Sequence, residues 1–452
     1  MIKYETDSRL IKNGQIFVAI VGHTVDGHDY IEKAVQNGAV KIIAEKAVKT
    51  SVPVLVVPST EEYLKEVLIK DYSPLLKDLK LIGVTGTNGK TTTCFLIYQL
   101  LKKFSKKVGY LGTIGFYYND IERELNNTTP DNLTIYKLLL EAKDNGAEYI
   151  VMEVSSHALE LERIVGLKFV TGAFTNLSQD HLDFHETMTN YLNSKLKLKN
   201  YLTEDGVMIV NDDDPSVKPF KTGNYVTIGK HGDYKIVNCD YYQDSTVIDF
   251  TFDKRIYKVK INLISSFNVY NYMMSLAILH SLGFKIEEII NKTDYIYSPK
   301  GRCESINVGN SFAVVDYAHT PDAVDKVIKA HLELEHNRII TIVGCGGDRD
   351  PKKRPIMGDI ATSLSDYVIF TNDNPRTEAP QKIMDDIVRD NTNTNYEIIF
   401  DRKEAIEKGL SMLDNKDFLL ILGKGHEDYQ IIGQEKIHCD DAEIVRNYSK
   451  YK

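Results

Sequence analysis

The chain has 452 residues, of which 42% are hydrophobic and 26% charged, and its formal net charge is −9. This length exceeds one ordinary domain, so two or three domains with separate cores are expected. The acidic balance without a basic run argues against a nucleic-acid partner, and no apolar stretch is long enough to span a membrane. Five scattered cysteines and an N-terminus without an apolar signal core indicate a cytoplasmic protein with reduced thiols.

The first block covers residues 1–72 and combines short strands with helical patterns. Apolar runs at residues 15–20, 40–44 and 54–57 predict strands, and a helical pattern begins near Asp29. A proline-containing stretch at residues 71–74 is a linker candidate. We therefore expect a small α/β domain here.

The second block, residues 73–298, alternates strand and helix signals. Strands are predicted at residues 81–85, 149–153, 172–175 and 207–211, and their continuous apolar runs are typical of a parallel sheet covered on both faces. Residues 233–263 alternate as antiparallel strands do, and a helix is expected from about Ser265. In parallel sheets ligands lie at the carboxyl ends of strands, where Glu153 and Asn176 fall.

Residues 81–97 predict a strand, a glycine-rich turn and a helix. Gly86 and Gly89 let backbone N–H groups close on phosphate oxygens, Lys90 can reach the β- and γ-phosphates, and the Thr91 hydroxyl can bind Mg²⁺. The strict Walker A pattern has a glycine where Val84 stands, so a turn without a ligand is the alternative. The strand before and the helix after favour ATP binding.

Three further groups in this block carry chemistry only if the fold brings them together. Glu153 closes a buried strand, as a metal-binding carboxylate would, although a solvated strand-end glutamate is commoner. His181 and His185 are predicted to share a helix face, which leaves a zinc site open, with surface histidines as the alternative. Taken by itself, Lys195 would be interpreted as a surface lysine.

The third block, residues 299–452, alternates helices with strands at residues 312–316, 338–343, 367–371 and 418–422. Each strand is followed by a polar loop, at residues 316–322, 344–349, 373–376 and 423–427. In a doubly wound sheet these four loops gather at one edge. Arginine with acidic side chains there suits a zwitterion, since arginine grips a carboxylate and acidic groups hold an ammonium.

Together these motifs resemble the Mur ligase family, and within it the MurE type, over essentially the whole chain. The resemblance rests on residues 7–9, 22–27, 86–91, 127–130, 153–157, 176–185, 316–319 and 373–376. Thr-Gly-Thr-Asn-Gly-Lys-Thr at residues 85–91 is the family's form of the phosphate loop. The resemblance implies an α/β protein of three domains: a UDP-sugar-binding domain (1–72), an ATP-binding catalytic domain with a P-loop ATPase-like parallel sheet (73–298), and an amino-acid-binding, doubly wound α/β domain (299–452).

The resemblance also implies a reaction. In this family ATP, with Mg²⁺, phosphorylates the D-glutamyl carboxylate of UDP-N-acetylmuramoyl-L-alanyl-D-glutamate. An amino-acid amine then attacks the acyl phosphate to give an amide, ADP and phosphate. The enzyme would serve cytoplasmic peptidoglycan precursor synthesis, and with it cell-wall biogenesis, cell shape and division. Its expected partners are these small-molecule substrates, and a monomer is expected.

Residue roles follow from the resemblance position by position. The catalytic residues would be Lys90, Glu153, His181 and Lys195. Mg²⁺ would be held by Thr91, Glu153, His181 and Lys195, the last as a carbamate because an ammonium cannot bind a cation. ATP would contact Gly86, Thr87, Asn88, Gly89, Lys90, Thr91, Asn268, Asn271, Arg302 and Asp316. The UDP-muramoyl dipeptide would contact Ser8, His23, Thr24, Val25, Asn127, Thr128, Thr129, Ser155 and Arg163. The amino acid would contact Arg349, Asp373, Asn374, Pro375, Arg376, Gly423 and Glu427.

Arg376 bears on the choice of amino acid. Family members with this arginine use meso-diaminopimelate, whose second carboxylate a guanidinium can grip, whereas users of L-lysine usually lack it. We therefore predict meso-diaminopimelate. Leu161 and Gln179 stand where the family often has Gln and Arg, which leaves an L-lysine ligase or a paralogue on a modified precursor as alternatives.

Two other classes of protein are alternatives. One is a folylpolyglutamate-type or cyanophycin-type amide ligase, against which the UDP-sugar-type motif at residues 7–9 argues. The other is a catalytically idle nucleotide-binding partner, against which the retained Lys90 and Glu153 argue.

Overall fold

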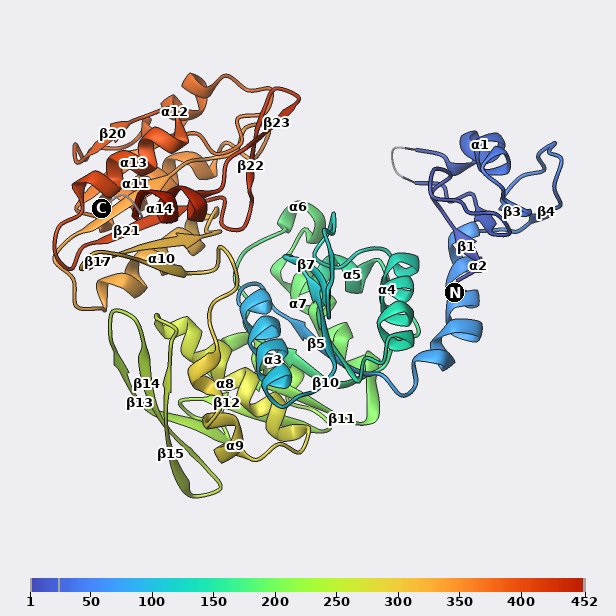
Figure 1. Ribbon diagram of the computed structural model, residues 1–452, viewed down its shortest axis with the longest axis horizontal. Helices are drawn as coiled ribbons and strands as arrows, with labels where there is room; N and C mark the ends of the chain where they lie inside the picture. Colours follow the sequence, from blue (N-terminus) through green and yellow to red (C-terminus); the bar gives the residue numbers. More distant parts are fainter. Residues whose placement is uncertain (1, 23–24, 450–452) are drawn as a thin grey trace.

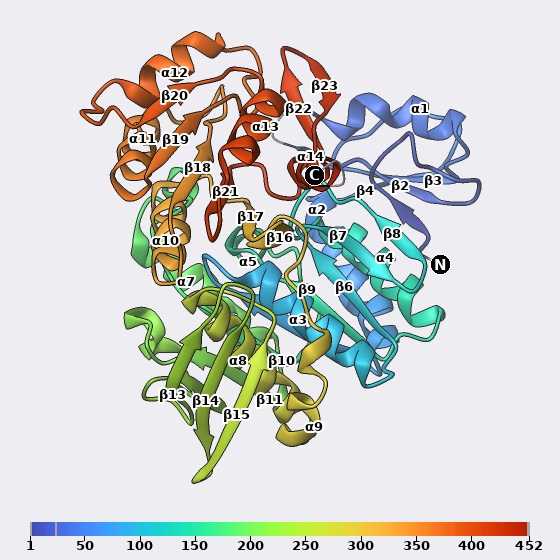
Figure 2. The same cartoon turned by 60° about the vertical axis from the view of Figure 1, so that its left-hand side comes forward.

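The computed structural model describes residues 2–22 and 25–449, and the chain folds around three large sheets, with a small two-stranded sheet, β22-β23, near the C-terminus (Figure 1). A four-stranded sheet comes first, an eleven-stranded sheet second and a six-stranded sheet third. We call the parts built on them the N-terminal, central and C-terminal units. In Figures 1 and 2 the N-terminal and C-terminal units both lie above the central unit.

The N-terminal unit is a parallel sheet in the order β1-β2-β3-β4. Its elements are β1 (Tyr4–Glu5), β2 (Ile16–Val18), the 3-10 turn η1 (Gly27–Tyr30), α1 (Ile31–Gln36), β3 (Lys41–Ala44) and β4 (Val54–Val56). Ile31 and Ala34 of α1 join the small core formed with Phe17 and Ile42. The three strands predicted in this block are confirmed.

A continuous helical connector leads from the N-terminal unit to the central unit. It consists of α2 (Thr60–Val67), the π-turn η2 (Leu68–Tyr72) and the 3-10 turn η3 (Ser73–Leu76). Ser59 caps α2 by accepting a hydrogen bond from the Glu62 N–H at 3.2 Å. Lys65 pairs with Glu162 of the central unit at 2.9 Å, so the connector is held against that unit. The predicted linker at residues 71–74 lies inside the connector.

The central sheet has the strand order β15-β14-β13-β12-β11-β10-β5-β9-β6-β7-β8. From β13 to β6 in this order the strands pair in parallel, and the pairs at both ends are antiparallel. The strands are β5 (Lys80–Thr85), β6 (Val108–Gly112), β7 (Gly115–Tyr118), β8 (Ile121–Arg123), β9 (Tyr149–Glu153), β10 (Phe169–Phe174), β11 (Leu202–Asn211), β12 (Tyr225–Gly229), β13 (Tyr234–Tyr241), β14 (Thr246–Phe252) and β15 (Arg255–Ile261). The helices are α3 (Lys90–Lys103), α4 (Asn132–Asp144), α5 (Ser156–Glu160), α6 (Leu182–His185), α7 (Met188–Leu196), α8 (Ser266–Ser281) and α9 (Ile286–Ile290), with 3-10 turns η4 (Lys197–Tyr201), η5 (Pro215–Phe220) and η6 (Thr293–Tyr295).

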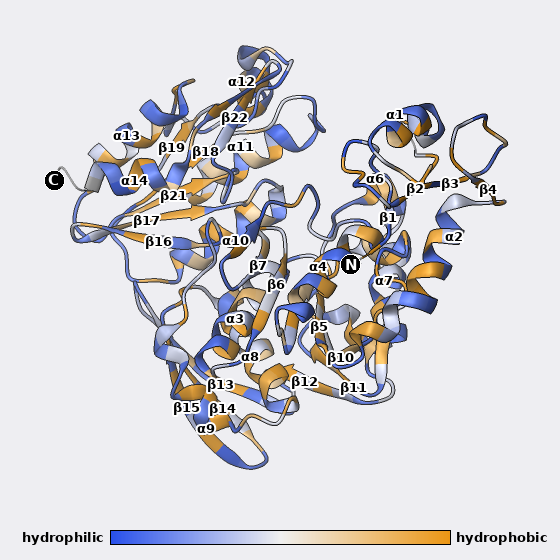
Figure 3. Cartoon of the chain, turned by 45° about the vertical axis from the view of Figure 1, so that its right-hand side comes forward, coloured by the Kyte–Doolittle hydropathy of each residue, from blue (hydrophilic) through white to orange (hydrophobic). Residues whose placement is uncertain are grey.

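Hydrophobic cores cover both faces of the central sheet. One core packs α3 and α8 on the sheet, and the other packs α4 and continues into the N-terminal unit through Val18 and Ile43. Figure 3 shows the hydrophobic colour concentrated on the strands and on the inward helix faces. Because both faces are buried, the parallel strands are continuous apolar runs, as predicted.

The C-terminal unit is a doubly wound sheet in the order β16-β17-β21-β18-β19-β20, parallel except for β16 with β17. Its elements are β16 (Glu304–Val308), β17 (Ser311–Asp316), α10 (Pro321–Leu332), β18 (Ile339–Val343), α11 (Lys353–Leu364), β19 (Tyr367–Phe370), α12 (Pro380–Val388), β20 (Tyr396–Ile398), α13 (Arg402–Met412), β21 (Phe418–Leu422), β22 (Tyr429–Ile432), β23 (Glu435–His438) and α14 (Asp441–Ser449). The helices α10 to α12 belong to the core on one face, and α13 and α14 to the core on the other.

The predicted fold class, a central parallel sheet followed by a doubly wound α/β sheet, is confirmed. Two strands begin earlier than predicted: β10 at Phe169 and β11 at Leu202. The register shifts between Phe169 and Thr171, and this irregularity interrupts the apolar pattern at the start of both strands. In the described part of the chain no helix is long and apolar enough to cross a membrane.

Arg402 and Asp441 form a fully buried ion pair between α13 and α14, with two contacts of 2.8 and 2.7 Å. Arg402→Met would leave the Asp441 carboxylate buried without its partner, at a cost of about 3–5 kcal/mol. We expect faster hydrogen exchange in α13 and α14 and a lower urea midpoint for the C-terminal unit. Arg402→Met/Asp441→Leu should recover most of the loss, and a double variant no more stable than the single one would contradict this account.

Candidate active site

The loop between β5 and α3 has the backbone that a phosphate loop needs. Gly86 and Gly89 have φ of 145° and 84°, in the region that L side chains rarely adopt. A Cβ on Gly86 would lie 1.9 Å from the Thr175 Oγ1, and one on Gly89 would lie 2.4 Å from the Asn271 Oδ1. Both positions therefore require glycine. The loop leads into the N-terminus of the 14-residue helix α3, which favours an anion.

Lys90, the first residue of α3, folds back over this loop. Its Nζ donates to the carbonyl oxygens of Gly86 at 2.9 Å and Thr87 at 2.8 Å. Burial lowers the pKa of Lys90, an effect that the Glu153 carboxylate opposes and the Arg302 guanidinium increases. A bound phosphate would favour the charged ammonium.

Glu153, the last residue of β9, is fully buried and accepts hydrogen bonds on both oxygens. Its Oε1 accepts from the Thr113 N–H at 2.8 Å and from the Tyr110 hydroxyl. Its Oε2 accepts from the hydroxyls of Thr91 at 2.9 Å and Thr113 at 3.2 Å. The carboxylate is therefore satisfied in the interior, and it connects the phosphate loop to the end of β6.

Lys195 lies on α7 and is 1% exposed, so it is not an ordinary surface lysine. Its Nζ donates to the Gly86 carbonyl at 2.8 Å and lies 4.1 Å from the centroid of the Tyr191 ring. Burial, with a contribution from the Lys90 ammonium, lowers the pKa of Lys195 well below its usual range. This environment favours a neutral amine, which is nucleophilic.

His181 does not share a helix face with His185, so that prediction is wrong. The helix α6 contains only Leu182–His185, and His181 is its N-cap residue with a left-handed φ of 52°. His181 lines the cavity described next, whereas His185 is buried against the Ser156 hydroxyl at 3.0 Å. Within residues 2–22 and 25–449 no group of three or more His, Cys, Asp or Glu side chains is arranged to hold a metal ion.

A cavity of about 650 Å³ lies between the central and C-terminal units, within the size range of small-ligand sites. From the central unit it is lined by Thr87, Asn88, Gly89, Lys90, Thr91, Glu153, His181, Asn268 and Asn271, among others. From the C-terminal unit Arg302 and Asp316 contribute. The structure thus brings every predicted ATP contact except Gly86 to the wall of one cavity.

Arg302, just before β16, and Asp316, the last residue of β17, enter this cavity from the same open end of the first hairpin of the C-terminal unit. The Arg302 guanidinium lies over the Tyr317 ring at 4.7 Å, and its Nε is buried without a hydrogen-bond partner among the described residues. Asp316 accepts the N–H groups of Cys303 at 2.7 Å and Ala318 at 2.8 Å, while burial raises its pKa. An unpaired guanidinium N–H beside the phosphate loop indicates a site for an anion.

The predicted substrate segment at residues 127–129 is tied to the same carboxylate. The hydroxyl of Thr128 lies 3.0 Å from that of Thr113, and the Thr129 hydroxyl donates to the Glu153 carbonyl at 2.8 Å. Arg163 donates from Nη1 to the Thr129 carbonyl at 2.8 Å. Thr128 also lines the cavity, so the predicted substrate segment reaches the cavity there.

The other predicted substrate residues of the central unit lie beside this segment. Ser155 donates its N–H to the Thr129 hydroxyl at 3.1 Å, and Asn127 is exposed. The two departures from the family pattern, Leu161 and Gln179, are also exposed.

In the N-terminal unit the two predicted substrate residues that the structure describes, Ser8 and Val25, do not line the cavity. Ser8 is buried, and its carbonyl accepts a hydrogen bond from the Asn37 side chain at 2.8 Å. Val25 is 51% exposed. His23 and Thr24 lie outside the described residues.

The four polar loops of the C-terminal unit gather at the carboxyl ends of β17, β21, β18 and β19, as predicted. The side-chain amide of Asn374 donates to the Glu427 Oε2 at 2.8 Å, and the backbone N–H of Asn374 donates to the Asp373 Oδ1 at 2.6 Å. A Cβ on Gly423, whose φ is 113°, would lie 2.7 Å from the Asp373 Oδ2. These loops therefore fit closely around two carboxylates and one amide.

Two arginines stand at the same edge. Arg376 has φ of 53° and donates from Nη1 to the Gly347 carbonyl at 2.8 Å. A Cβ on Gly347 would lie 1.9 Å from the Pro375 carbonyl oxygen, which shows how closely the two loops approach. Arg349 is exposed and has no hydrogen-bond or ion-pair partner in the described part of the chain.

Three residues of this site were missed by the sequence analysis. Tyr110 and Thr113 hold Glu153, and the fully buried Lys424 contacts Glu427 at 3.0 Å and Asn374 at 3.3 Å. Lys424 lies within the predicted loop at residues 423–427, so the motif itself was a signal. Tyr110 and Thr113 follow no spacing that sequence alone would single out.

Comparison with known proteins gives full-length matches. Three family models match: "Mur ligase family, catalytic domain" at residues 4–78, "Mur ligase middle domain" at 84–279 and "Mur ligase, glutamate ligase domain" at 301–425. The chain is 42% identical over 454 residues to UDP-N-acetylmuramoyl-L-alanyl-D-glutamate–2,6-diaminopimelate ligase 1 of Clostridium acetobutylicum, covering 98% of this chain and 94% of that protein.

Solved structures show the same architecture. A UDP-N-acetylmuramoyl-L-alanyl-D-glutamate–2,6-diaminopimelate ligase matches with a TM-score of 0.71 at 30% identity, over 100% of this chain and 95% of that one. MurF ligase from Thermotoga maritima in complex with ADP matches with a TM-score of 0.71 at 20% identity, over 99% and 97%, which shows the fold alone.

Gly86→Ala should weaken ATP binding at least about tenfold, because the new Cβ would collide with Thr175 and the φ is strained. Thr175 cannot easily move, since its hydroxyl donates to the Asn88 carbonyl at 2.6 Å. Gly283→Ala is the control: φ there is 96°, but a Cβ would meet nothing within 4 Å. Calorimetric titration with ATP checks both variants, and wild-type affinity in Gly86→Ala would contradict the close fit.

Proposed function

Since the chain belongs to the Mur ligase family, we propose that it is the ATP-dependent ligase that joins meso-diaminopimelate to UDP-N-acetylmuramoyl-L-alanyl-D-glutamate. The observation that carries the proposal is the edge where Arg349 and Arg376 stand beside Asp373 and Glu427, in a chain 42% identical to a diaminopimelate ligase. Two guanidiniums and two carboxylates match an amino acid with two carboxylates and two ammonium groups.

The reaction has to make a poor electrophile reactive. The D-glutamyl carboxylate oxygen attacks the γ-phosphorus of ATP, the bond from that phosphorus to the bridging oxygen breaks, and ADP leaves. The neutral diaminopimelate amine then attacks the acyl carbon, the C–N bond forms, and phosphate leaves. The proton of the attacking amine passes to solvent.

The cavity between the units is the proposed ATP site. Lys90 and Arg302 would neutralise the phosphate groups, and the N–H groups from Thr87 to Thr91 would hold their oxygens. Asn268, Asn271 and Asp316, which line the same cavity, would contact the nucleoside side. Supporting this, the buried Nε of Arg302 has no protein partner among the described residues.

The residues also fit Mg²⁺. Thr91 and Glu153 present oxygen atoms 2.9 Å apart at the cavity wall, and oxygen is the donor that Mg²⁺ prefers. Binding would replace the hydroxyl contacts of Glu153. His181 and a carbamylated Lys195 would complete the set. Bound Mg²⁺ would supply positive charge to the phosphate oxygens.

The remaining residues are assigned to the acceptor and the amino acid. Asn127, Thr128, Thr129, Ser155 and Arg163 would hold the muramoyl dipeptide, and Ser8 with residues 23–25 would hold the uridine diphosphate. Arg349, the segment at residues 373–376, Gly423 and Glu427 would hold diaminopimelate. The domains would run from 1 to 72, 73 to 298 and 299 to 452. We further propose a cytoplasmic monomer, and its five cysteines are unpaired.

Phosphate release with UDP-N-acetylmuramoyl-L-alanyl-D-glutamate, screened across amino acids, tests the activity. We expect meso-diaminopimelate to exceed L-lysine by about 100-fold or more in kcat/KM, because lysine has one carboxylate and leaves one of the two guanidinium groups unpaired. Equal or better turnover of L-lysine would contradict the assignment of meso-diaminopimelate as the substrate. Release with a folate acceptor instead would favour the folylpolyglutamate-type alternative.

Lys195→Ala should lower turnover by about 100-fold or more, because the proposed carbamate would help to hold the Mg²⁺ that neutralises the phosphate oxygens. Short carboxylic acids such as acetate should partly restore it by supplying the missing oxygens. Since carbon dioxide adds to the neutral amine, the modification should fall as pH falls, and mass spectrometry of the intact protein at several pH values checks this. Undiminished turnover in Lys195→Ala would refute the role.

A further inference from the structure

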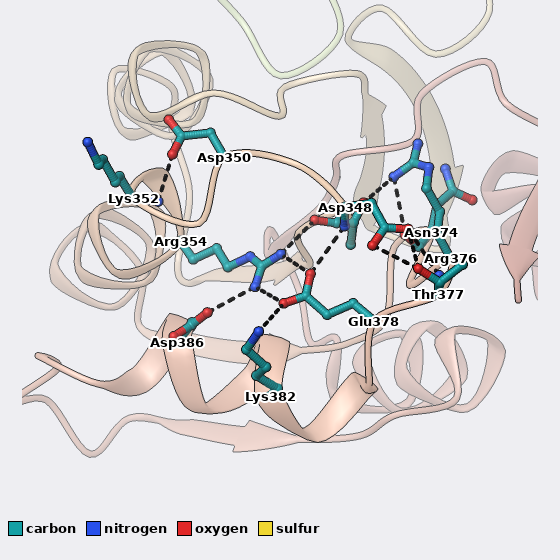
Figure 4. A network of polar contacts seen from close by, with 12 residues as sticks. Asp348, Asp350, Lys352, Arg354, Asn374, Arg376, Thr377, Glu378, Lys382 and Asp386 are labelled. Carbon is teal, nitrogen blue, oxygen red and sulfur yellow. Dashed lines mark hydrogen bonds and ion pairs between the residues drawn. The ribbon is translucent and has the colours of Figure 1, made fainter.

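Arg354 is a fully buried arginine that no step of the proposed reaction uses. It lies in the first turn of α11 and is 0% exposed. Its Nη1 donates to the Glu378 Oε1 and the Asp386 Oδ2, both at 2.9 Å. Its Nη2 donates to the Glu378 Oε2 at 2.6 Å and to the Gly346 carbonyl at 3.2 Å. One guanidinium therefore joins three separate segments of the C-terminal unit (Figure 4).

Two of these segments are the loops that carry Arg349 and Arg376. Gly346 belongs to the loop after β18, and Glu378 follows the loop after β19. The loops are also joined directly: the Gly347 N–H donates to the Asn374 carbonyl at 2.9 Å. A Cβ on Gly346 would lie 2.9 Å from the Arg376 Nη1 and 3.6 Å from the Arg349 Cγ, so the two arginine side chains flank one glycine.

A second, exposed contact joins the same loops. The Thr377 N–H and hydroxyl donate to the Asp348 carboxylate at 3.1 and 2.9 Å, and the Asp348 N–H donates to Glu378 at 3.1 Å. Figure 4 shows Asp348 between Thr377 and Glu378. Because Asp348 immediately precedes Arg349, and Thr377 immediately follows Arg376, this contact links the neighbours of both arginines.

The charges around Arg354 are already balanced. Glu378 and Asp386 pair with it, and Lys382 and Arg389 pair with those carboxylates from the solvent side. Arg354 lowers the pKa of Glu378 to about 2, so this carboxylate stays ionised. The two acids are thus occupied and do not neutralise Arg349, which has no partner among the described residues.

We propose that Arg354 is a positioning residue that fixes the separation of Arg349 and Arg376, and that this separation selects an amino acid with a second carboxylate. The inference rests on the proposed function. Arginine suits the task because its planar fork binds the two Glu378 oxygens and still reaches Asp386 and Gly346. Lysine has one nitrogen and cannot hold all three segments.

Arg354→Lys tests the proposal with steady-state kinetics for meso-diaminopimelate, L-lysine and ATP. We expect KM for diaminopimelate to rise about tenfold or more, since small displacements of positioning groups have large effects. The preference for diaminopimelate over L-lysine should fall by a similar factor, while KM for ATP stays within about twofold. Loss of stability alone would lower all activities together.

Two further variants keep the test decisive if Arg354→Lys does not fold. Thr377→Val removes the exposed hydroxyl contact to Asp348, and it should reduce the same preference about threefold. Arg338→Lys is the matched control, because Arg338 pairs with Asp417 at the opposite end of β18 and should leave the preference unchanged.

The outcomes separate the two proposals. If the wild type does not use diaminopimelate, the proposed function fails. If the wild type prefers diaminopimelate and a folded Arg354→Lys or Thr377→Val keeps that preference, the positioning role is overturned. A reduced preference in Arg354→Lys and Thr377→Val, but not in Arg338→Lys, supports it.

Discussion

The central unit is organised by the need to satisfy one buried carboxylate. Glu153 is fully buried, and Thr91, Thr113 and Tyr110 donate hydrogen bonds that satisfy its oxygens in the interior. These donors come from α3, from the turn after β6 and from β6 itself, so satisfying Glu153 fixes the first turn of α3 against the sheet. Thr113 also contacts Thr128, which places the segment at residues 127–129, proposed to bind the acceptor, relative to the same group. The distance between the phosphate loop and residues 127–129 therefore follows from one hydrogen-bond network.

Positive charge is the second constraint, and it explains why two units must meet. Lys90 and Lys195 both donate to the Gly86 carbonyl, and burial lowers the pKa of both lysines. Arg302 adds a cation from the C-terminal unit beside Lys90. Such an arrangement is unfavourable without an anion, so a bound nucleotide would draw the two units together. Catalysis by domain closure is the expected consequence.

The sequence predicted most strands and the phosphate loop because both leave local patterns. Continuous apolar runs mark parallel strands, and Gly86 and Gly89 mark the turn. It failed at His181, where a left-handed residue starts a helix too short to have a shared face. Tyr110 was also beyond reach, since its role depends on a strand pairing across 43 positions in sequence. No sequence pattern indicates that Lys195 is buried, and only the packed fold shows it.

The arginines of the C-terminal unit that concern the site are of two kinds, and the difference separates structural roles from binding roles. Arg402 and Arg354 each contact carboxylates at 2.9 Å or less, so their charge is balanced within the fold. The Nε of Arg354 is unpaired, as is that of Arg302, but Arg302 and Arg349 form no ion pair at all in the described part of the chain. An unpaired guanidinium is unfavourable in the protein alone and becomes favourable when an anionic group arrives. The paired cations therefore hold the loops, and the unpaired ones are those that we propose to bind phosphate and carboxylate.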